Sequence, residues 1–377
     1  MSTTQVTAVP LDDRGDGWNR FSDVERIAVL RAGGLGDFLF ALPALHALRE
    51  TYPGSEITVL GAPMHAELML GRPGPPDRVM VVPPVEGVRP GASDPAHVAA
   101  FLDEMRASDF DLAVQLHGGG RNSNPFVQQL GARHTIGTRT PDAAALERTT
   151  PYLYYQNEFV RGLEVAALAG ARPSRYGYEP VLARTPGASG LRVLQREGIQ
   201  VQGRPLVVMH PGASDPRRRW PAEHFARIAA ELSAVGAAVV VVGEAGERQL
   251  CDAVVHGAQQ RDAAAASVAG RLDLGELAAV LGDADVVIAN DSGPRHLAHA
   301  LGTATVGVYW IGNLINAGPL TRAHHRVHLG WTTHCPVCGV DCTAENPASA
   351  RCEHDVSFVA EVPWPEVLSS ALDLLHG

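Results

Sequence analysis

The stretch ADVVIANDSGPRHLAHALG, residues 284–302, contains the clearest fold signal in the chain. It begins with an apolar run, 284–289, that is typical of a buried parallel strand, and it ends with residues 296–302, which favour a short helix stopped by a glycine. Between them lies the polar turn DSG at 291–293. A strand, a turn of this kind and a helix together direct backbone N–H groups and a positive helix end toward an anionic ligand. The stretch predicts either a phosphate site or an ordinary capped β–α turn of an α/β protein.

Four residues of this unit are candidates for contacts with the ligand. Ser292 is suited to capping the helix, and Gly293 leaves room for a phosphate against the backbone. His296 lies one turn into the helix on the ligand side, and Asp291 would orient the turn or a hydroxyl of the ligand.

A second strand–turn–helix unit lies near the N-terminus. The strand candidate 24–30 precedes the turn RAGGLGD at 31–37, and residues 38–49 have helical periodicity. The turn is not the dinucleotide fingerprint G-x-G-x-x-G, because its glycines are spaced differently and an acid opens the helix. Gly36 and Asp37 fall at the carboxyl end of the strand, where open α/β sheets bind ligands. Asp37 is therefore either a helix cap or a general base.

Strand and helix patterns alternate along most of the chain, which predicts parallel sheets and two doubly wound, Rossmann-like lobes that face a cleft. Residues 1–22 are polar and are expected to form a disordered leader, 23–184 the first lobe and 191–362 the second. The expected strands are 26–31, 56–60, 78–82, 111–116, 134–136, 205–209, 237–242, 267–269, 285–289 and 304–308. The expected helices are 38–50, 95–107, 123–130, 157–170, 221–235, 245–258, 273–281, 294–301 and 363–376.

The composition limits the class of protein. A hydrophobic content of 45% in 377 residues is enough for two cores, and no apolar run approaches the roughly 18 residues of a membrane span. The net charge of −10 argues against nonspecific nucleic-acid binding. All 31 basic residues are arginine, so phosphate recognition has to use guanidinium groups. We expect a cytoplasmic protein without nucleic-acid partners, and peripheral membrane contact stays open.

The segment HPGASDPRRRWP, residues 210–221, ends another predicted strand and is the main candidate for pyrophosphate binding. Arg218 and its two neighbours can neutralise a diphosphate beside Ser214, although a solvated basic turn would have the same sequence. At the next strand end, Glu244 or Glu247 is suited either to ribose hydroxyls or to helix capping. Leu272 opens a helix where a nucleotide base would lie, acting through backbone atoms.

The first lobe offers a second candidate binding site. Residues 111–123 predict a strand that delivers a polar, Gly-rich loop to the same rim as Asp37. The candidate contacts with sugar hydroxyls or anions are Gln115, His117, Arg121 and Asn122. His117 is either a second base or a structural histidine.

Four of the five cysteines lie close together in the sequence near the C-terminus. The segment CPVCG at 335–339 is a zinc-knuckle pattern, and four thiolates complete a tetrahedral structural site. The predicted ligands are Cys335, Cys338, Cys342 and Cys352, with His334 and His354 as spare candidates. Reduced thiols that pack a loop are one alternative, and a disulfide, which a cytosolic location disfavours, is another. No Asp-x-Asp motif accompanies the predicted donor site, so a catalytic metal is not expected.

Three motifs in this order resemble the heptosyltransferase-like glycosyltransferases of family nine: GDFLFALPAL at 36–45, HPGASDPRRRWPAEHF at 210–225 and NDSGPRHLAHALG at 290–302. The resemblance extends from Val24 to about Leu375. It implies the GT-B architecture, in which residues 363–377 would pack back on the first lobe. It also implies that one basic residue before Trp-Pro contacts the donor phosphates. Arg218 fits that position best and Arg219 is the alternative, whereas the family often has lysine there.

The resemblance further implies an inverting, metal-independent transfer of a sugar from a nucleotide diphosphate to an acceptor hydroxyl. The first lobe would bind the acceptor, with Gln115, His117, Arg121 and Asn122 as the candidate contacts. Asp37 would be the base, ADP-heptose the donor, and a zinc ion at most structural. The family's usual acceptor is a lipopolysaccharide core, while another envelope component or a secondary metabolite stays open. A nucleotide-sugar epimerase on the same architecture and a non-catalytic nucleotide-sugar-binding protein are alternative interpretations.

Overall fold

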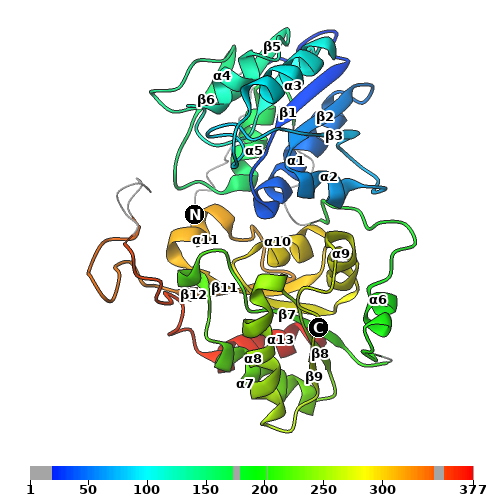
Figure 1. Ribbon diagram of the computed structural model, residues 1–377, viewed down its shortest axis with the longest axis vertical. Coiled ribbons are helices and arrows are strands. Elements are labelled where there is room, and N and C mark those ends of the chain that lie inside the picture. Colours follow the sequence, from blue (N-terminus) through cyan, green and yellow to red (C-terminus); the bar gives the residue numbers. More distant parts are fainter. Residues whose placement is uncertain (1–18, 173–178, 202, 344–351, 377) are drawn as a thin grey trace, which may run out of the picture.

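A computed structural model describes residues 19–172, 179–201, 203–343 and 352–376, and it contains two α/β lobes, one above the other in Figure 1. Each lobe is built on a parallel sheet of six strands, with the orders β3-β2-β1-β4-β5-β6 and β12-β11-β10-β7-β8-β9. The predicted α/β class with two doubly wound lobes is therefore confirmed.

The elements of the first lobe are β1 (Arg26–Leu30), α1 (Leu35–Thr51), β2 (Glu56–Gly61), α2 (Pro63–Met69), β3 (Arg78–Val81), α3 (Pro95–Ala107), β4 (Leu112–Gln115), α4 (Ser123–Gln128), β5 (His134–Arg139), β6 (Arg148–Pro151) and α5 (Glu158–Ala167). Those of the second lobe are α6 (Gly190–Arg196), β7 (Leu206–His210), η1 (Pro216–Arg218), α7 (Ala222–Ala234), β8 (Ala238–Val241), η2 (Ala245–Glu247), α8 (Arg248–Gln259), β9 (Ala265–Ser267), α9 (Leu274–Asp283), β10 (Val286–Asn290), α10 (Gly293–Ala300), β11 (Ala304–Trp310), α11 (Ile311–Ala317), β12 (His325–Gly330) and α13 (Trp364–His376). The predicted strands and helices are present within a few residues of these bounds, whereas α2, β6, α6, α11 and β12 were not predicted.

The central strands of both sheets are almost wholly buried. The sequences RIAVL of β1, LVVMH of β7 and VVIAN of β10 are nearly continuous apolar runs, as strands covered by helices on both faces require. In each sheet the strand order reverses next to such a strand, between β1 and β4 and between β7 and β10. Ligands of open α/β sheets bind at the carboxyl ends of strands at this switch point. The predicted functional turns after β1, β4, β7 and β10 all begin there.

The two lobes join through apolar contacts made by the helices that follow these strands. The α1 helix packs against α10, and α2 packs against α9. Phe40 of α1 and Phe159 of α5 form one apolar cluster with Tyr309 and Ala317 of the second lobe. The side-chain amide of Asn316 also donates to the carbonyl of Tyr154, at 2.5 Å. These contacts hold the switch points of the two sheets opposite each other.

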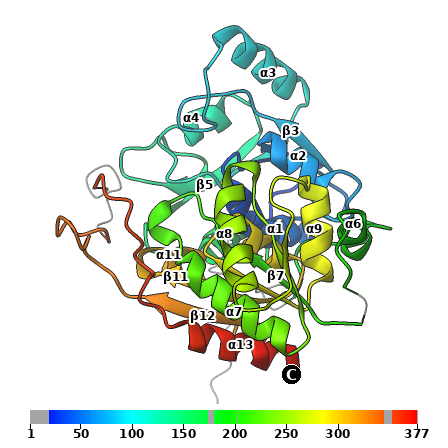
Figure 2. The same ribbon diagram turned by 60° about the horizontal axis from the view of Figure 1, so that its bottom comes forward.

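The predicted position of the C-terminal helix, residues 363–377, is wrong. In the structure α13 packs against α7 and against strands β10, β11 and β12, all of the second lobe, as Figure 2 also shows. Val367 and Ala371 are fully buried in the core of that lobe. The apolar stripe of α13 thus covers a face of the second sheet and leaves no apolar side for the first lobe.

The predicted disordered leader, residues 1–22, lies largely outside the described residues. Its last four residues are described, and they pack against the first lobe. Phe21 is 5% exposed, stacks on His134 with ring centroids 4.1 Å apart, and donates its N–H to the Tyr52 hydroxyl at 3.2 Å. Disorder is therefore wrong for residues 19–22. Among the helices that the structure describes, none has the length and apolar character needed to traverse a bilayer.

Buried histidines should make this fold sensitive to acid. Burial is the main cause that lowers the pKa of His65, His117 and His296 to about 4 and that of His325 to about 3, from an ordinary value of 6.5. Between these values the unfolded chain binds protons that the folded chain excludes, so the free energy of unfolding should fall as the pH drops from about 6.5 to about 4.

His65→Gln should make that slope shallower by up to about 1.4 kcal/mol per pH unit, the effect of one proton. Urea unfolding at a series of pH values measures the slope. His97→Gln, at an exposed position of α3, is the matched control and should leave the slope unchanged. Equal slopes for the two variants would contradict the assignment of the acid sensitivity to buried histidines.

Candidate active site

A pocket of about 880 Å³ lies between the lobes, at the carboxyl ends of the central strands. From the first lobe it is lined by the turn after β1 and by parts of α1, α2 and α5. From the second lobe it is lined by the turns after β7, β8 and β10 and by parts of α9 and α11. The predicted base and nearly all predicted donor-site residues line it: Gly36, Asp37, Ser214, Arg218, Glu244, Glu247, Leu272, Asp291, Ser292, Gly293 and His296.

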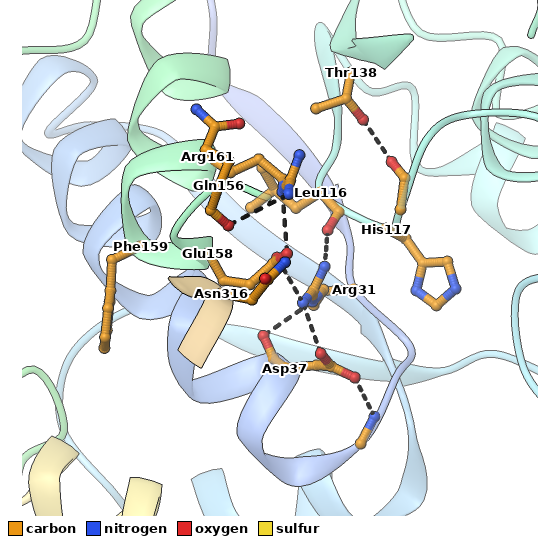
Figure 3. Close-up of polar contacts among 12 residues, drawn as sticks. Arg31, Asp37, Leu116, His117, Thr138, Gln156, Glu158, Phe159, Arg161 and Asn316 are labelled. Atoms are coloured by element: carbon orange, nitrogen blue, oxygen red, sulfur yellow. Dashed lines mark hydrogen bonds and ion pairs between the residues drawn. The ribbon is translucent and has the colours of Figure 1, made fainter. Parts of the chain in front are cut away.

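Asp37 occupies the third position of α1 and has two roles. Its Oδ2 accepts the N–H of Gly34 at 3.0 Å, which caps the helix, and its Oδ1 pairs with Nη2 of Arg31 at 2.9 Å (Figure 3). The side chain is nevertheless 49% exposed and lines the pocket. The capping role and an accessible carboxylate are thus compatible.

Asp291, just after β10, is the buried centre of the opposite wall. Its Oδ2 accepts from Nη1 of Arg218 at 3.1 Å and from Nδ2 of Asn313 at 2.8 Å, and its Oδ1 accepts from Nε2 of His296 at 2.9 Å. Burial alone would raise the pKa of Asp291, but the bond from His296 and the charges of Arg218 and Arg295 outweigh it and lower the pKa. The ionised carboxylate therefore holds Arg218 at the pocket wall.

His296 is occupied at both ring nitrogens. Its Nε2–H donates to Asp291, and its Nδ1 accepts from the guanidinium of Arg295. Burial, followed by the charge of Arg295, lowers the pKa of His296 to about 4, so the imidazole is neutral at pH 7. Its bond to Asp291 fixes that carboxylate in the pocket wall, and a contact of His296 with a phosphate stays a prediction.

The two lobes approach each other closely at this histidine. The His296 ring packs edge-on against Phe40 with centroids 4.6 Å apart, and a Cβ built on Gly36 would lie 3.1 Å from Cδ2 of the ring. A Cβ built on Gly293 would lie 3.4 Å from the side chain of Leu35. Small residues at positions 36 and 293 thus let the start of α1 meet the start of α10.

Of the three consecutive arginines, only Arg218 lines the pocket. Arg217 is buried and pairs with Asp215 through Nη2 at 2.6 Å, and Arg219 donates its Nε–H to the carbonyl of Ala213 at 2.9 Å. These residues lie in and after η1, a 3-10 turn, in which successive side chains point about 120° apart. The geometry therefore favours Arg218 over Arg219 for contact with a donor.

Glu244 and Glu247, the two acids after β8, differ in how far their carboxylates are free to contact a ligand in the pocket. His210 contacts Glu247 Oε2 through Nε2 at 3.1 Å and Ser292 Oγ through Nδ1 at 3.0 Å. Glu247 also accepts the N–H of Glu244 at 3.0 Å, which caps η2. Burial would raise the pKa of Glu247, but the bond with His210 lowers it. Glu244 is exposed at the pocket edge, so it is the acid with a carboxylate available to a ribose.

The predicted acceptor contacts do not line this pocket. Gln115 is fully buried, and its amide bonds Asn124 Oδ1 at 2.8 Å and the N–H of His117 at 2.7 Å, so its prediction as a sugar contact is wrong. Burial lowers the pKa of His117 to about 4, which favours the structural interpretation. Arg121, with 79% of its side chain exposed, and Asn122, also exposed, lie farther along the loop.

Sequence reasoning missed several residues at the pocket. Glu158, at the start of α5, lines it together with Asn313 and Asn316 of α11, and Arg31 lies directly behind Asp37. Arg31 is the first residue of the Gly-rich turn at 31–37, so the sequence already placed a positive charge close to Asp37. Glu158 belongs to α5, a predicted helix that carries no functional motif. Asn313 and Asn316 belong to α11, a helix of seven residues that was not predicted.

The cysteine cluster lies apart from the pocket and differs from its prediction in one ligand. The ligand atoms of Cys335, Cys338, Cys352 and His354 all lie within 4.8 Å of one another. Cys342 is not in this group, and its Sγ–H donates to the carbonyl of Val340 at 3.4 Å. Of the four predicted ligands, Cys342 is thus not gathered with the other three thiols, and His354, named as a spare candidate, lies beside them instead. Nδ1 of His354 is buried and has no partner among the described residues, as suits a ligand.

Comparison with known proteins agrees with this geometry. The family described as glycosyltransferase family 9 (heptosyltransferase) matches residues 98–346. Lipopolysaccharide heptosyltransferase 2 of Salmonella typhimurium is 31% identical over 296 residues, which cover 75% of this chain and 82% of that protein. The match to lipooligosaccharide heptosyltransferase 2 of Haemophilus ducreyi, 31% identical over 102 residues, spans only 29% of that protein's length.

Solved structures show the same fold. The glycosyl transferase of family 9 from Veillonella parvula superposes with a TM-score of 0.72 at 21% identity, covering 93% of this chain and 97% of that one. The ADP-heptose lipopolysaccharide heptosyltransferase II of E. coli gives a TM-score of 0.70 at 18% identity, covering 93% and 98%. The expected GT-B architecture is confirmed by these likenesses and by the two parallel sheets.

Proposed function

The chain belongs to glycosyltransferase family 9, the heptosyltransferases, and on that premise we propose that it transfers a sugar from a nucleotide diphosphate, ADP-heptose in the first instance, to an acceptor hydroxyl. The observation that carries the proposal is the composition of one pocket. Its first-lobe wall presents the accessible carboxylate of Asp37, and its second-lobe wall presents Arg218 and the N-terminus of α10. A base and an anion-binding wall that face each other suit displacement of a diphosphate.

The proposed reaction inverts the anomeric carbon. Asp37 accepts the proton of the acceptor hydroxyl as its oxygen attacks the sugar from the face opposite the diphosphate. Arg218 and the N–H groups at Ser292 and Gly293 stabilise the negative charge on the departing diphosphate. Because a guanidinium and a helix end supply this charge, the assignment requires no metal in the chemical step.

The acceptor in this proposal is a hydroxyl of a glycan, of another envelope component or of a secondary metabolite. For the location we propose the cytoplasm, whose reducing environment would keep the cysteines as thiols that a metal can bind.

A thermal-shift panel of nucleotide diphosphate sugars tests the donor assignment. A ligand at a hundredfold excess over its dissociation constant stabilises the folded state by about 2.7 kcal/mol, so ADP-heptose should raise the melting temperature clearly. Chromatography of the reaction should then detect free ADP and unaltered residual donor, which distinguishes a transferase from an epimerase. Failure of every nucleotide sugar in the panel to stabilise the protein would refute the proposed donor site.

We also propose that Cys335, Cys338, Cys352 and His354 hold a structural zinc ion. Three thiolates and one imidazole are a common tetrahedral set for structural zinc, and the four groups are already gathered. Such an ion would tie the loop after β12 to the segment that leads into α13. Its energy would contribute to folding and not to the chemical step.

Elemental analysis should find about one zinc per chain in the wild type. Cys352→Ser should lose most of that metal and lower the melting temperature, whereas Cys342→Ser, at the neighbouring cysteine outside the cluster, should retain it. ADP binding should survive in both variants, because the pocket lies elsewhere. Absence of metal from the wild type, or equal loss in both variants, would rule out this ligand set.

A further inference from the structure

Arg31 holds the proposed base from behind, at the centre of the polar contacts in Figure 3. Its Nη2 pairs with Asp37 Oδ1 at 2.9 Å, and its Nε–H donates to the backbone carbonyl of Asp37, also at 2.9 Å. Its Nη1 donates to the carbonyl of Leu116, just after β4. The residue is 7% exposed. One buried guanidinium thus fixes both the carboxylate and the backbone of Asp37 to the switch point of the first sheet.

A second carboxylate shares this guanidinium. Glu158 Oε2 lies 3.3 Å from the same Nη2 of Arg31, although the two residues are 127 positions apart in sequence. The other oxygen, Oε1, accepts from Nε of Arg161 at 3.0 Å. Arg161 is 3% exposed and is itself fixed by a bond to the carbonyl of Leu153 at 2.7 Å. The charges therefore alternate from Arg161 through Glu158 and Arg31 to Asp37.

This alternation bears on how well Asp37 can take a proton. A guanidinium next to a carboxylate favours the ionised form, which keeps a base ready but also makes it weaker. A second carboxylate on the same N–H group offsets part of that effect. Glu158 is suited to this because its side chain is only 17% exposed, where solvent screening is reduced. Two other titratable side chains respond to the charge of Asp37, His65 of α2 and His117 after β4, and burial lowers the pKa of each to about 4, so both are neutral at pH 7.

We propose that Arg31 and Glu158 are positioning residues for the reaction: Arg31 orients the carboxylate of Asp37, and Glu158 holds Arg31 in place and offsets its charge. This inference rests on the proposed function, in which Asp37 is the base. It predicts opposite effects for removal of the two charges, which a merely structural pair would not produce.

The pH dependence of ADP release from saturating ADP-heptose, with water as the acceptor, tests the inference. In Arg31→Gln the acid limb of the profile should move to higher pH by about one unit, because the carboxylate loses its neighbouring cation. In Glu158→Gln, which retains the shape of the side chain, the limb should move to lower pH, and turnover at pH 7 should fall by roughly tenfold. Arg31→Lys should return the acid limb toward its wild-type position, because lysine restores the positive charge although it lacks the paired N–H donors of the guanidinium.

ADP affinity, measured by calorimetry, should stay within about twofold of wild type in these variants, because neither residue belongs to the diphosphate wall. Glu223→Gln is the matched control: Glu223 pairs with Arg227 at 2.7 Å on the exposed side of α7, and its loss should leave profile and turnover unchanged.

Acid limbs that do not move, or that move in the same direction in Arg31→Gln and Glu158→Gln, would overturn the inference. Sugar transfer by the wild type would in that case leave the proposed function intact. If Arg31→Gln does not fold, the acid limb of the Glu158→Gln profile alone tests the proposal, and an acid limb that does not move refutes it. A wild-type protein that releases no ADP from any nucleotide sugar would remove the proposed function and this inference together.

Discussion

Replacement of Asp37 by asparagine should reduce turnover by roughly 10²–10⁴ with little change in ADP affinity. The variant keeps the side-chain shape and an oxygen that can accept the Gly34 N–H, so the cap on α1 should survive. It loses the group that takes the proton of the attacking hydroxyl. Steady-state ADP release from ADP-heptose measures the loss, and calorimetry with ADP measures the binding.

A matched control separates the base from the cap. Asp273 caps α9 through the N–H of Glu276 at 2.7 Å, also at the pocket, so Asp273→Asn repeats the same chemical change at a cap of the second lobe. Its turnover should change far less than that of Asp37→Asn. Near-full turnover of Asp37→Asn at saturating donor would show that Asp37 serves only as a cap.

Arg218→Ala should weaken ADP binding by about 1.5–3 kcal/mol, roughly a 10- to 150-fold rise in the dissociation constant. The substitution removes the one arginine of the RRR segment that lines the pocket, and it leaves the buried Asp291 without a cationic partner from η1. Isothermal titration calorimetry with ADP gives the change directly.

The neighbouring arginine supplies the control. Arg219→Ala should have a much smaller effect, because its guanidinium bonds the carbonyl of Ala213 and does not line the pocket. His296→Ala should weaken ADP binding less than Arg218→Ala, since His296 acts through Asp291. Unchanged ADP affinity in Arg218→Ala would remove the diphosphate site from this turn.

The fold could be predicted because its determinants are local. The strands β1, β7 and β10 are apolar runs that end in polar turns, and parallel strands bring such ends to one edge of each sheet. The helices α2, α6 and α11 have only seven residues each, about two turns, which is too short for a periodic signal. The contacts of α13 depend on which part of the second sheet is not covered by other helices, and a local sequence pattern does not contain this information.

In the candidate site, too, some residues could be predicted from local sequence, whereas others depend on tertiary contacts. Residues of the turns after β1, β7, β8 and β10 reach the pocket because chain direction alone places them there. Gln115 also ends a strand, but its partner Asn124 turns it into the interior, and only the path of the loop determines this. The exchange of Cys342 for His354 likewise follows from the fold of the loop and not from spacing. The pairing of Arg31 with Glu158 joins elements that the sequence never relates.

The packing of α13 on the second sheet has a consequence for how such a protein can be recombined. Because this helix does not return to the first lobe, the described chain passes from one lobe to the other only once, between α5 and α6. Each lobe is therefore encoded by one continuous stretch of the gene. One crossover in that connection exchanges the whole nucleotide-facing half, with α13 and the cysteine cluster included, and cuts neither sheet. Chimeras with relatives need only one junction, and the surfaces to be matched across it are those of α1 with α10 and of α2 with α9.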